Sequence, residues 1–171
     1  MERYIEKQIA EAKKTNELDL TDTNLTAIPP EVFELTELEE LYLSNNHINK
    51  IPEQINKLVK LKELYLDNNR LNELHRGLGN LQDLEILYLS NNYIRIIPSY
   101  IGQLHYLQEI NLNYNNITRI STDIRKLKKL KKLHLSGNQI DNIPKWIYQL
   151  TNLEQLGLGN NWLHDIPVVL N

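Results

Sequence analysis

The stretch LEELYLSNNHINKIPEQINKLVK, residues 38–60, decides the fold because it returns every 23 residues along the chain. Its first position is a leucine in six successive copies, with no insertion between them: Leu38, Leu61, Leu84, Leu107, Leu130 and Leu153. A unit of this length cannot bury an apolar face by itself, whereas a stack of such units can. The period therefore predicts a solenoid.

Two apolar columns follow, three and five residues after that leucine. They are Leu18, Leu41, Leu64, Leu87, Ile110, Leu133 and Leu156, and then Leu20, Leu43, Leu66, Leu89, Leu112, Leu135 and Leu158. The alternation of apolar and polar residues predicts a short strand whose apolar side chains share one face. Successive strands are then expected to pair in a parallel sheet, at about 4.8 Å per turn.

An asparagine column marks the sharp turn after each strand. It runs Asn46, Asn69, Asn92, Asn115, Asn138 and Asn161, and Thr23 takes its place in the first copy. A turn that faces the interior leaves backbone groups without water, and an amide side chain offers these groups both donors and an acceptor. We expect the stacked asparagines to form a ladder along the solenoid.

The rest of each copy closes the outer side. Proline follows the second isoleucine or leucine after the turn in most copies, although His75 and Ser121 replace it in the third and fifth. Proline suits the entry to a helical or extended segment. The two apolar positions that follow are three residues apart, as in Ile55 and Leu58, which predicts a short helix or 3₁₀ turn.

The combined pattern L-x-x-L-x-L-x-x-N-x-L with I-P-x-x-I-x-x-L resembles the 23-residue class of leucine-rich repeats, known from bacterial and Ras-suppressor-type proteins. The resemblance covers about residues 15 to 170. It implies an α/β fold: a right-handed solenoid of about seven turns, with a parallel concave sheet and short helical or 3₁₀ segments on the convex side. Residues 15–171 would form this solenoid.

Residues 1–14 do not match the repeat. Tyr4, Ile5, Ile9 and Ala12 share one helical face, and the opposite face is charged. We expect a capping helix over the open end of the core, which solenoids need. The segment and the residues after it also resemble the start of repeat domains in bacterial Roco proteins, which implies an alternative role as the recognition or scaffold domain of a larger signalling protein. No G-x-x-x-x-G-K-[ST] motif for a GTPase occurs in this chain.

Composition places the chain among soluble, cytoplasmic proteins. It has 41% hydrophobic residues, a net charge of −3 and no cysteine. Secreted small domains tend to use disulfides, and no stretch is apolar enough to span a membrane. The acidic balance also argues against a nucleic-acid partner.

The C-terminal end is expected to be apolar. It carries Leu156, Leu158, Leu163, Ile166 and Leu170, with no polar segment after them. Such an end is compatible with a frayed final turn, with a homodimer formed end to end, with a partner protein or with a longer natural chain.

The sequence predicts no enzyme, cofactor or metal site. His134 is the one histidine expected on the concave strands, between Asn111 and Gly157 of the adjacent turns, and only Glu109 approaches it diagonally. A histidine placed this way is better explained as a contact residue than as a catalytic base. No cluster has metal-ligand spacing.

The basic run at 125–132 supports an alternative function. Six of its eight residues are lysine or arginine, so the 125–134 edge is a candidate for an anion or nucleic acid. The period, however, spreads most of these residues around the rim and puts only Lys132 on the concave face.

The concave face is the preferred candidate site, because solenoid curvature makes an extended binding surface there. Tyrosine is enriched at binding hot spots, although a row of tyrosines on neighbouring strands also stabilises the sheet. We therefore predict a protein partner with a basic or amphipathic surface opposite an acidic and aromatic half, and an acidic feature opposite the other end. The predicted contact residues are Glu40, Tyr42, Glu63, Tyr65, Asp67, Ile86, Tyr88, Glu109, Asn111, Tyr114, Lys132 and His134.

Overall fold

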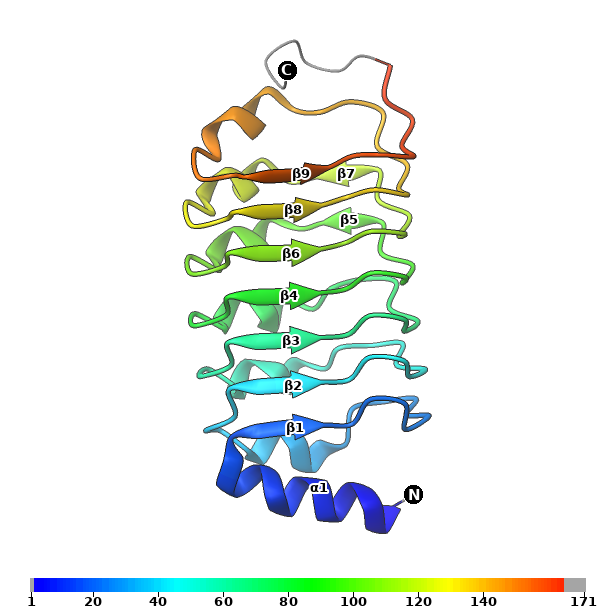
Figure 1. The fold of residues 1–171 in the computed structure, drawn as a ribbon, viewed down its shortest axis with the longest axis vertical. Coiled ribbons are helices and arrows are strands. Elements are labelled where there is room, and N and C mark those ends of the chain that lie inside the picture. Colours follow the sequence, from blue (N-terminus) through cyan, green and yellow to red (C-terminus); the bar gives the residue numbers. More distant parts are fainter. Residues whose placement is uncertain (1, 165–171) are drawn as a thin grey trace.

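The computed structural model describes residues 2–164, which form a curved stack of turns (Figure 1). One parallel sheet of seven strands runs through the whole stack. In order, these strands are β1 (Glu17–Asp19), β2 (Glu40–Tyr42), β3 (Glu63–Tyr65), β4 (Ile86–Tyr88), β6 (Glu109–Asn111), β8 (Lys132–His134) and β9 (Gln155–Gly157). We number the turns one to seven by these strands. The predicted α/β solenoid with a parallel sheet is confirmed.

Each strand shows the alternation that the sequence predicts. Leu41, at the centre of β2, is fully buried, while Glu40 and Tyr42 on either side lie on the solvent-facing, concave face of the sheet. The register repeats without a shift, since Tyr42 pairs with Tyr65 and Tyr65 pairs with Tyr88. Residues one period apart are therefore neighbours in space.

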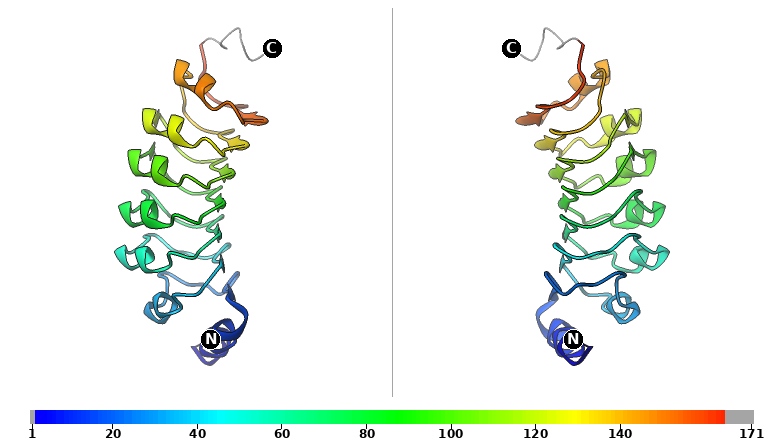
Figure 2. Two further views of the ribbon diagram at one scale, coloured as in Figure 1. Left: turned by 90° about the vertical axis from the view of Figure 1, so that its left-hand side faces the viewer. Right: turned by 90° about the vertical axis from the view of Figure 1, so that its right-hand side faces the viewer.

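Short 3₁₀ helices cover the opposite side. They are η1 (Pro30–Glu34), η2 (Glu53–Lys57), η3 (Arg76–Asn80), η4 (Ser99–Gln103), η5 (Thr122–Lys126) and η6 (Lys145–Gln149). Figure 2 shows the strands on the inner side of the curve and the 3₁₀ helices on the outer side. Both the concave sheet and the convex 3₁₀ segments were predicted from the repeat.

The two proline replacements keep the 3₁₀ helices capped. The His75 side chain accepts a hydrogen bond from the Gly77 N–H at 3.1 Å, and the Ser121 hydroxyl accepts one from the Asp123 N–H at 3.3 Å. Side-chain caps of this kind satisfy an N–H group that the helix leaves free.

A second sheet, which the sequence did not predict, pairs β5 (Ile96–Ile97) with β7 (Arg119–Ile120) on the segment between turn and 3₁₀ helix. Ser121 explains part of this pairing, because its backbone N–H donates to the Ile97 carbonyl at 3.0 Å. Proline, which most turns carry at this position, has no N–H to donate.

The asparagine ladder holds neighbouring turns together and is buried from Asn46 to Asn138. The Asn69 Oδ1 accepts from the Ile48 N–H at 2.9 Å, and its Nδ2 donates to the carbonyls of Leu43 and Leu66 at 2.9 and 3.2 Å. Asn92, Asn115, Asn138 and Asn161 repeat this pattern. Most of these bonds cross to the preceding turn, so the ladder fixes the stacking of turns as well as the bend within each one.

The helix α1 (Glu2–Thr15) lies across the N-terminal end of the stack (Figure 1) and runs to Thr15 rather than residue 14. Its Ala12 is buried, and Ile5 and Ile9 pack against the core. Within residues 2–164, no helix combines the length and apolar character that crossing a bilayer requires.

At the other end, part of the predicted apolar surface can be described. Leu156, Leu158 and Leu163 are partly buried against the core. Ile166 and Leu170 lie outside the described residues.

Candidate functional site

The centre of the concave face is a tyrosine row formed by Tyr42, Tyr65 and Tyr88 on β2, β3 and β4. The rings of Tyr42 and Tyr65 stack with centroids 4.8 Å apart and planes 10° apart. The rings of Tyr65 and Tyr88 meet edge to face at 5.1 Å and 69°. Both geometries are favourable for aromatic pairs, so the row is a continuous and partly exposed surface.

Glutamates hold the first two tyrosines in place. The Tyr42 hydroxyl donates to Glu40 at 2.6 Å, and the Tyr65 hydroxyl donates to Glu63 at 2.8 Å. The hydrogen bond to Glu40, together with burial, raises the pKa of Tyr42 above its ordinary value. Burial and the hydrogen bond to Glu63 raise the pKa of Tyr65 in the same direction. These phenols therefore stay protonated and keep donating to their glutamates.

The third tyrosine turns to the next strand, because Ile86 occupies the position where β2 and β3 carry a glutamate. Its hydroxyl donates to Glu109 on β6, and burial with this bond raises the pKa of Tyr88 to about 12. Ile86 is partly buried beside it. With isoleucine at position 86, the side chains of Tyr88 and Glu109 thus link β4 to β6.

Glu109 also joins the tyrosine row to the C-terminal half of the face. It accepts a hydrogen bond from the Lys132 ammonium at 2.9 Å, and His134 Nε2 lies 3.9 Å from its other oxygen. Although burial alone favours the neutral acid, the bonds from Tyr88 and Lys132 lower the pKa of Glu109. The predicted Lys132 and His134 are therefore joined to Tyr88 through one ionised carboxylate.

Two predicted contact residues support the backbone after the strands. Asp67 accepts hydrogen bonds from the Ser90 N–H and hydroxyl at 2.8 and 2.6 Å. The Asn111 side chain accepts from the Asn113 N–H at 3.1 Å. Both lie at the concave face, but part of their hydrogen-bonding capacity is already used within the chain.

Tyr114 differs from the other candidates in its backbone. It occupies the turn after β6 with φ +54°, at a position where the other turns carry asparagine, aspartate or glycine. A left-handed conformation is costly for a bulky residue. The ring is 56% exposed and lies over Gly137, where a Cβ would come within 2.6 Å of Tyr114 Cδ1. Gly137 therefore makes the space that this ring uses.

Sequence reasoning placed Tyr114 on the concave face but missed its strained backbone. The signal was present in the column Asp22, Asn45, Asn68, Asn91, Tyr114, Gly137 and Asn160. All members except the tyrosine tolerate a left-handed conformation well.

Three lysines of the basic edge are already engaged within the chain. Lys126 pairs with Asp123 at 3.0 Å, Lys128 donates to the Gln149 carbonyl at 3.0 Å, and Lys129 lies 3.6 Å above the Tyr106 ring. The lysines point to different parts of the rim, so they do not converge on one anion.

The described residues offer no metal-binding cluster. In residues 2–164, no group of three or more histidine, cysteine, aspartate and glutamate side chains is placed to hold a metal ion. The concave face combines aromatic surface, ionised carboxylates and hydrogen-bonding groups, which are properties of a binding surface.

Comparisons with known proteins agree with this architecture. The family model described as "leucine rich repeat" matches residues 13–71, and the one described as "leucine-rich repeat region" matches residues 74–166. No curated protein gives a significant match.

Several solved structures are similar. An internalin from Listeria monocytogenes has 24% identity and a TM-score of 0.81 over 92% of this chain and 45% of its own. A leucine-rich repeat protein of Leptospira interrogans has 36% identity and a TM-score of 0.67 over 88% and 44%. The plant peptide hormone receptor RGFR1, in complex with RGF2, has 32% identity and a TM-score of 0.73 over 80% and 23%. The chain thus spans less than half of each of these structures. Together, the two family models and the stacked turns show that the chain belongs to the leucine-rich repeat family.

Proposed function

We propose that the concave face binds a partner protein that presents basic side chains to the tyrosine row. Leucine-rich repeat proteins are typically binding scaffolds without enzymatic activity. Among the structural neighbours, the RGFR1 structure is that of a peptide hormone receptor in complex with RGF2. These relatives support a binding role, and the residues of this chain indicate which partner chemistry fits.

The observation that carries the proposal is the partly exposed row of three tyrosines in ring contact, with their carboxylates. The hydroxyls of Tyr42, Tyr65 and Tyr88 each donate to a glutamate, and all three side chains stay partly exposed. Rings held in this way lose little conformational entropy when a partner binds.

Charge favours a basic partner. The seven strands carry five carboxylates, at Glu17, Asp19, Glu40, Glu63 and Glu109, but only one lysine, Lys132. Because Lys132 is paired with Glu109, the N-terminal half of the face has negative charge without a nearby cation on the strands. A lysine or arginine of the partner would pair with a glutamate and lie against a tyrosine ring.

The test is affinity capture from lysate of the source cell, followed by titration of the purified partner. The variant Tyr42→Ala/Tyr65→Ala/Tyr88→Ala should lose the partner. The matched control Tyr106→Ala/Tyr148→Ala removes exposed tyrosines from outside the strands and should retain it. Circular dichroism checks that both variants fold.

Two further variants separate the contribution of the tyrosine rings from that of the carboxylate charge. Replacing the three tyrosines by phenylalanine keeps the aromatic surface and should preserve most of the affinity, whereas Glu40→Gln/Glu63→Gln should weaken binding and reduce its dependence on salt. Equal affinity of the alanine variant and the wild type for the purified partner would refute the proposed site.

A further inference from the structure

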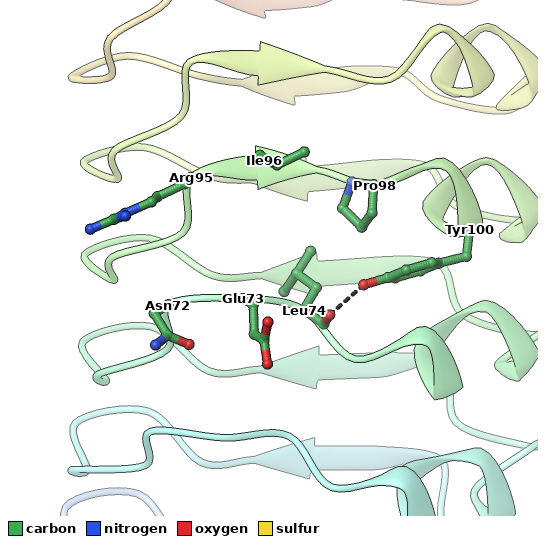
Figure 3. A pocket seen from close by; sticks show the side chains of 7 residues that line it. All are labelled: Asn72, Glu73, Leu74, Arg95, Ile96, Pro98 and Tyr100. Carbon is green, nitrogen blue, oxygen red and sulfur yellow. Dashed lines mark hydrogen bonds between the residues drawn. The ribbon is translucent and has the colours of Figure 1, made fainter.

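A pocket of about 490 Å³ lies outside the concave face, on the segment that joins the asparagine turn to the 3₁₀ helix (Figure 3). It is formed between residues 72–74 of turn three and residues 95–100 of turn four. We call it the flank pocket. Its walls include Glu73, Leu74, Arg95, Ile96, Pro98 and Tyr100.

Tyr100 shapes this pocket by reaching from η4 back to the preceding turn. Its hydroxyl donates to the Leu74 carbonyl, as the dashed line in Figure 3 shows. On the other side of turn four, β5 pairs with β7. The backbone of turn four is thus hydrogen-bonded to turn five along this segment, whereas a tyrosine side chain bridges it to turn three, and the pocket lies on the turn-three side.

The pocket presents an apolar side chain to solvent. Ile96 on β5 is 41% exposed, although the equivalent positions one period away are Glu73 and Arg119. The core side of β5 is occupied by Ile97, which is buried. Packing therefore does not require an isoleucine at position 96, and its exposure, together with the ring of Tyr100 and the proline, gives the pocket apolar walls.

Two arginines stand beside Ile96 without a carboxylate partner among the described residues. Arg95 is adjacent in sequence, and Arg119 is the register partner of Ile96 in β7. Some other exposed cations on the solenoid are paired with an acid of the neighbouring turn. They include Lys57, Lys60 and Lys62, which bind Glu34, Glu37 and Glu39. Arg95 lines the flank pocket and Arg119 lies beside Ile96 on the next strand, so both guanidinium groups are available to a ligand there.

We propose that the flank pocket binds an acidic peptide segment of a partner protein. An apolar side chain of the peptide enters between Ile96 and Tyr100, and carboxylates that follow it pair with Arg95 and Arg119. Guanidinium groups bind carboxylates through two parallel hydrogen bonds, which gives both strength and direction. Glu73 lines the turn-three side and repels a carboxylate there, so the acidic end of the peptide points toward turn five.

A peptide ligand fits this surface better than a nucleic acid does. The walls are apolar, Glu73 lies within them, and the chain carries a net charge of −3. A nucleic-acid site would need a broader basic stripe with stacking aromatic rings. The site is separate from the tyrosine row, so it makes a prediction that does not depend on the proposed function.

The test uses a blocked peptide with one leucine followed by three aspartates, titrated into the full chain while backbone amide signals are recorded by NMR. Signals of residues 73–74 and 95–97 should shift. The variant Arg95→Gln/Arg119→Gln should bind at least tenfold more weakly. A control, Arg3→Gln/Arg125→Gln, changes the net charge equally at exposed sites away from the pocket and should bind like the wild type.

Two altered peptides test the two halves of the proposal. Asparagine in place of aspartate should abolish binding, and glycine in place of leucine should weaken it at least fivefold. Tyr65→Ala should have no effect, which distinguishes this site from the concave face. No shifts at the pocket at millimolar peptide, equal affinity of the Arg95→Gln/Arg119→Gln variant, or tighter binding of a single-stranded oligonucleotide at the same residues would overturn the proposal.

Discussion

Removing one asparagine from the ladder should cost less than its hydrogen bonds suggest, because the ladder shares its acceptors. The leucine carbonyls at the five middle turns, from Leu43 to Leu135, each accept from two asparagines. The Leu66 carbonyl, for example, accepts from Asn69 at 3.2 Å and from Asn92 at 2.9 Å. In Asn69→Ala, this carbonyl keeps its second donor, and the Leu43 carbonyl keeps Asn46 at 3.0 Å.

Only the Ile48 N–H then loses its partner, at a cost of about 1–3 kcal/mol. The same reasoning gives Asn92→Ala one unpaired N–H, that of Leu71. The double variant leaves both N–H groups and, in addition, the Leu66 carbonyl without donors. We therefore expect it to lose about 1 kcal/mol or more beyond the sum of the single variants.

The matched control is Asn69→Ala/Asn115→Ala. These two asparagines share no acceptor, because Asn115 donates to Leu89 and Leu112. The stability lost by this double variant should equal the sum of the two single losses within about 0.5 kcal/mol. Free energies of unfolding from urea titration provide the measurement. If the losses in the free energy of unfolding are additive for both double variants, the shared carbonyls do not depend on the asparagine donors. That result would refute the predicted coupling.

Three further predictions concern single sites. Tyr114→Asn should raise the free energy of unfolding by about 1 kcal/mol, because asparagine tolerates φ +54° better than tyrosine; a loss in urea titration would show that the ring on Gly137 is a net stabiliser. Gly102→Ala should destabilise by about 1–3 kcal/mol, since its Cβ would lie 2.3 Å from the Asp123 carbonyl oxygen, whereas Gly159→Ala, with its nearest atom at 3.7 Å, should change stability little; equal melting temperatures would contradict this contrast. Because folding raises the pKa of Tyr88 from 10.0 to about 12, its contribution to stability is complete below pH 10 and is lost as the pH rises to about 12. Tyr88→Phe should flatten the stability profile in that window, and an unchanged slope would exclude Tyr88 as a cause.

The sequence predicted the stack of strands and convex segments well because these elements repeat with a fixed period. Leu41 and its equivalents had to be buried, and Glu40 and Tyr42 had to lie on the opposite face, once the period and the strand alternation were recognised. The tyrosine row follows from the same register. Which glutamate each tyrosine binds was less accessible, because Tyr88 changes its partner where Ile86 interrupts the glutamate column.

The flank pocket was not predicted because no column of the repeat produces it. It depends on Tyr100, which bends back to the Leu74 carbonyl, and on the pairing of β5 with β7. Side-chain direction outside a regular strand is set by local packing, and one period of sequence does not encode it. The sequence shows that Ile96 is apolar where the neighbouring turns carry Glu73 and Arg119, but it does not show that this side chain lines a pocket.

Departures from a repeat column carry information about function only when the new residue does not serve the fold. His75 and Ser121 replace proline, but each caps a 3₁₀ helix, so structure alone explains them. Ile96 leaves an apolar side chain exposed, and Tyr114 adopts a conformation that its equivalents tolerate better. No cap or similar structural role accounts for these two residues, which agrees with the proposals that each contacts a partner. By the same reasoning, replacing either residue by the type found in neighbouring turns should preserve or increase stability and reduce binding at its own site alone.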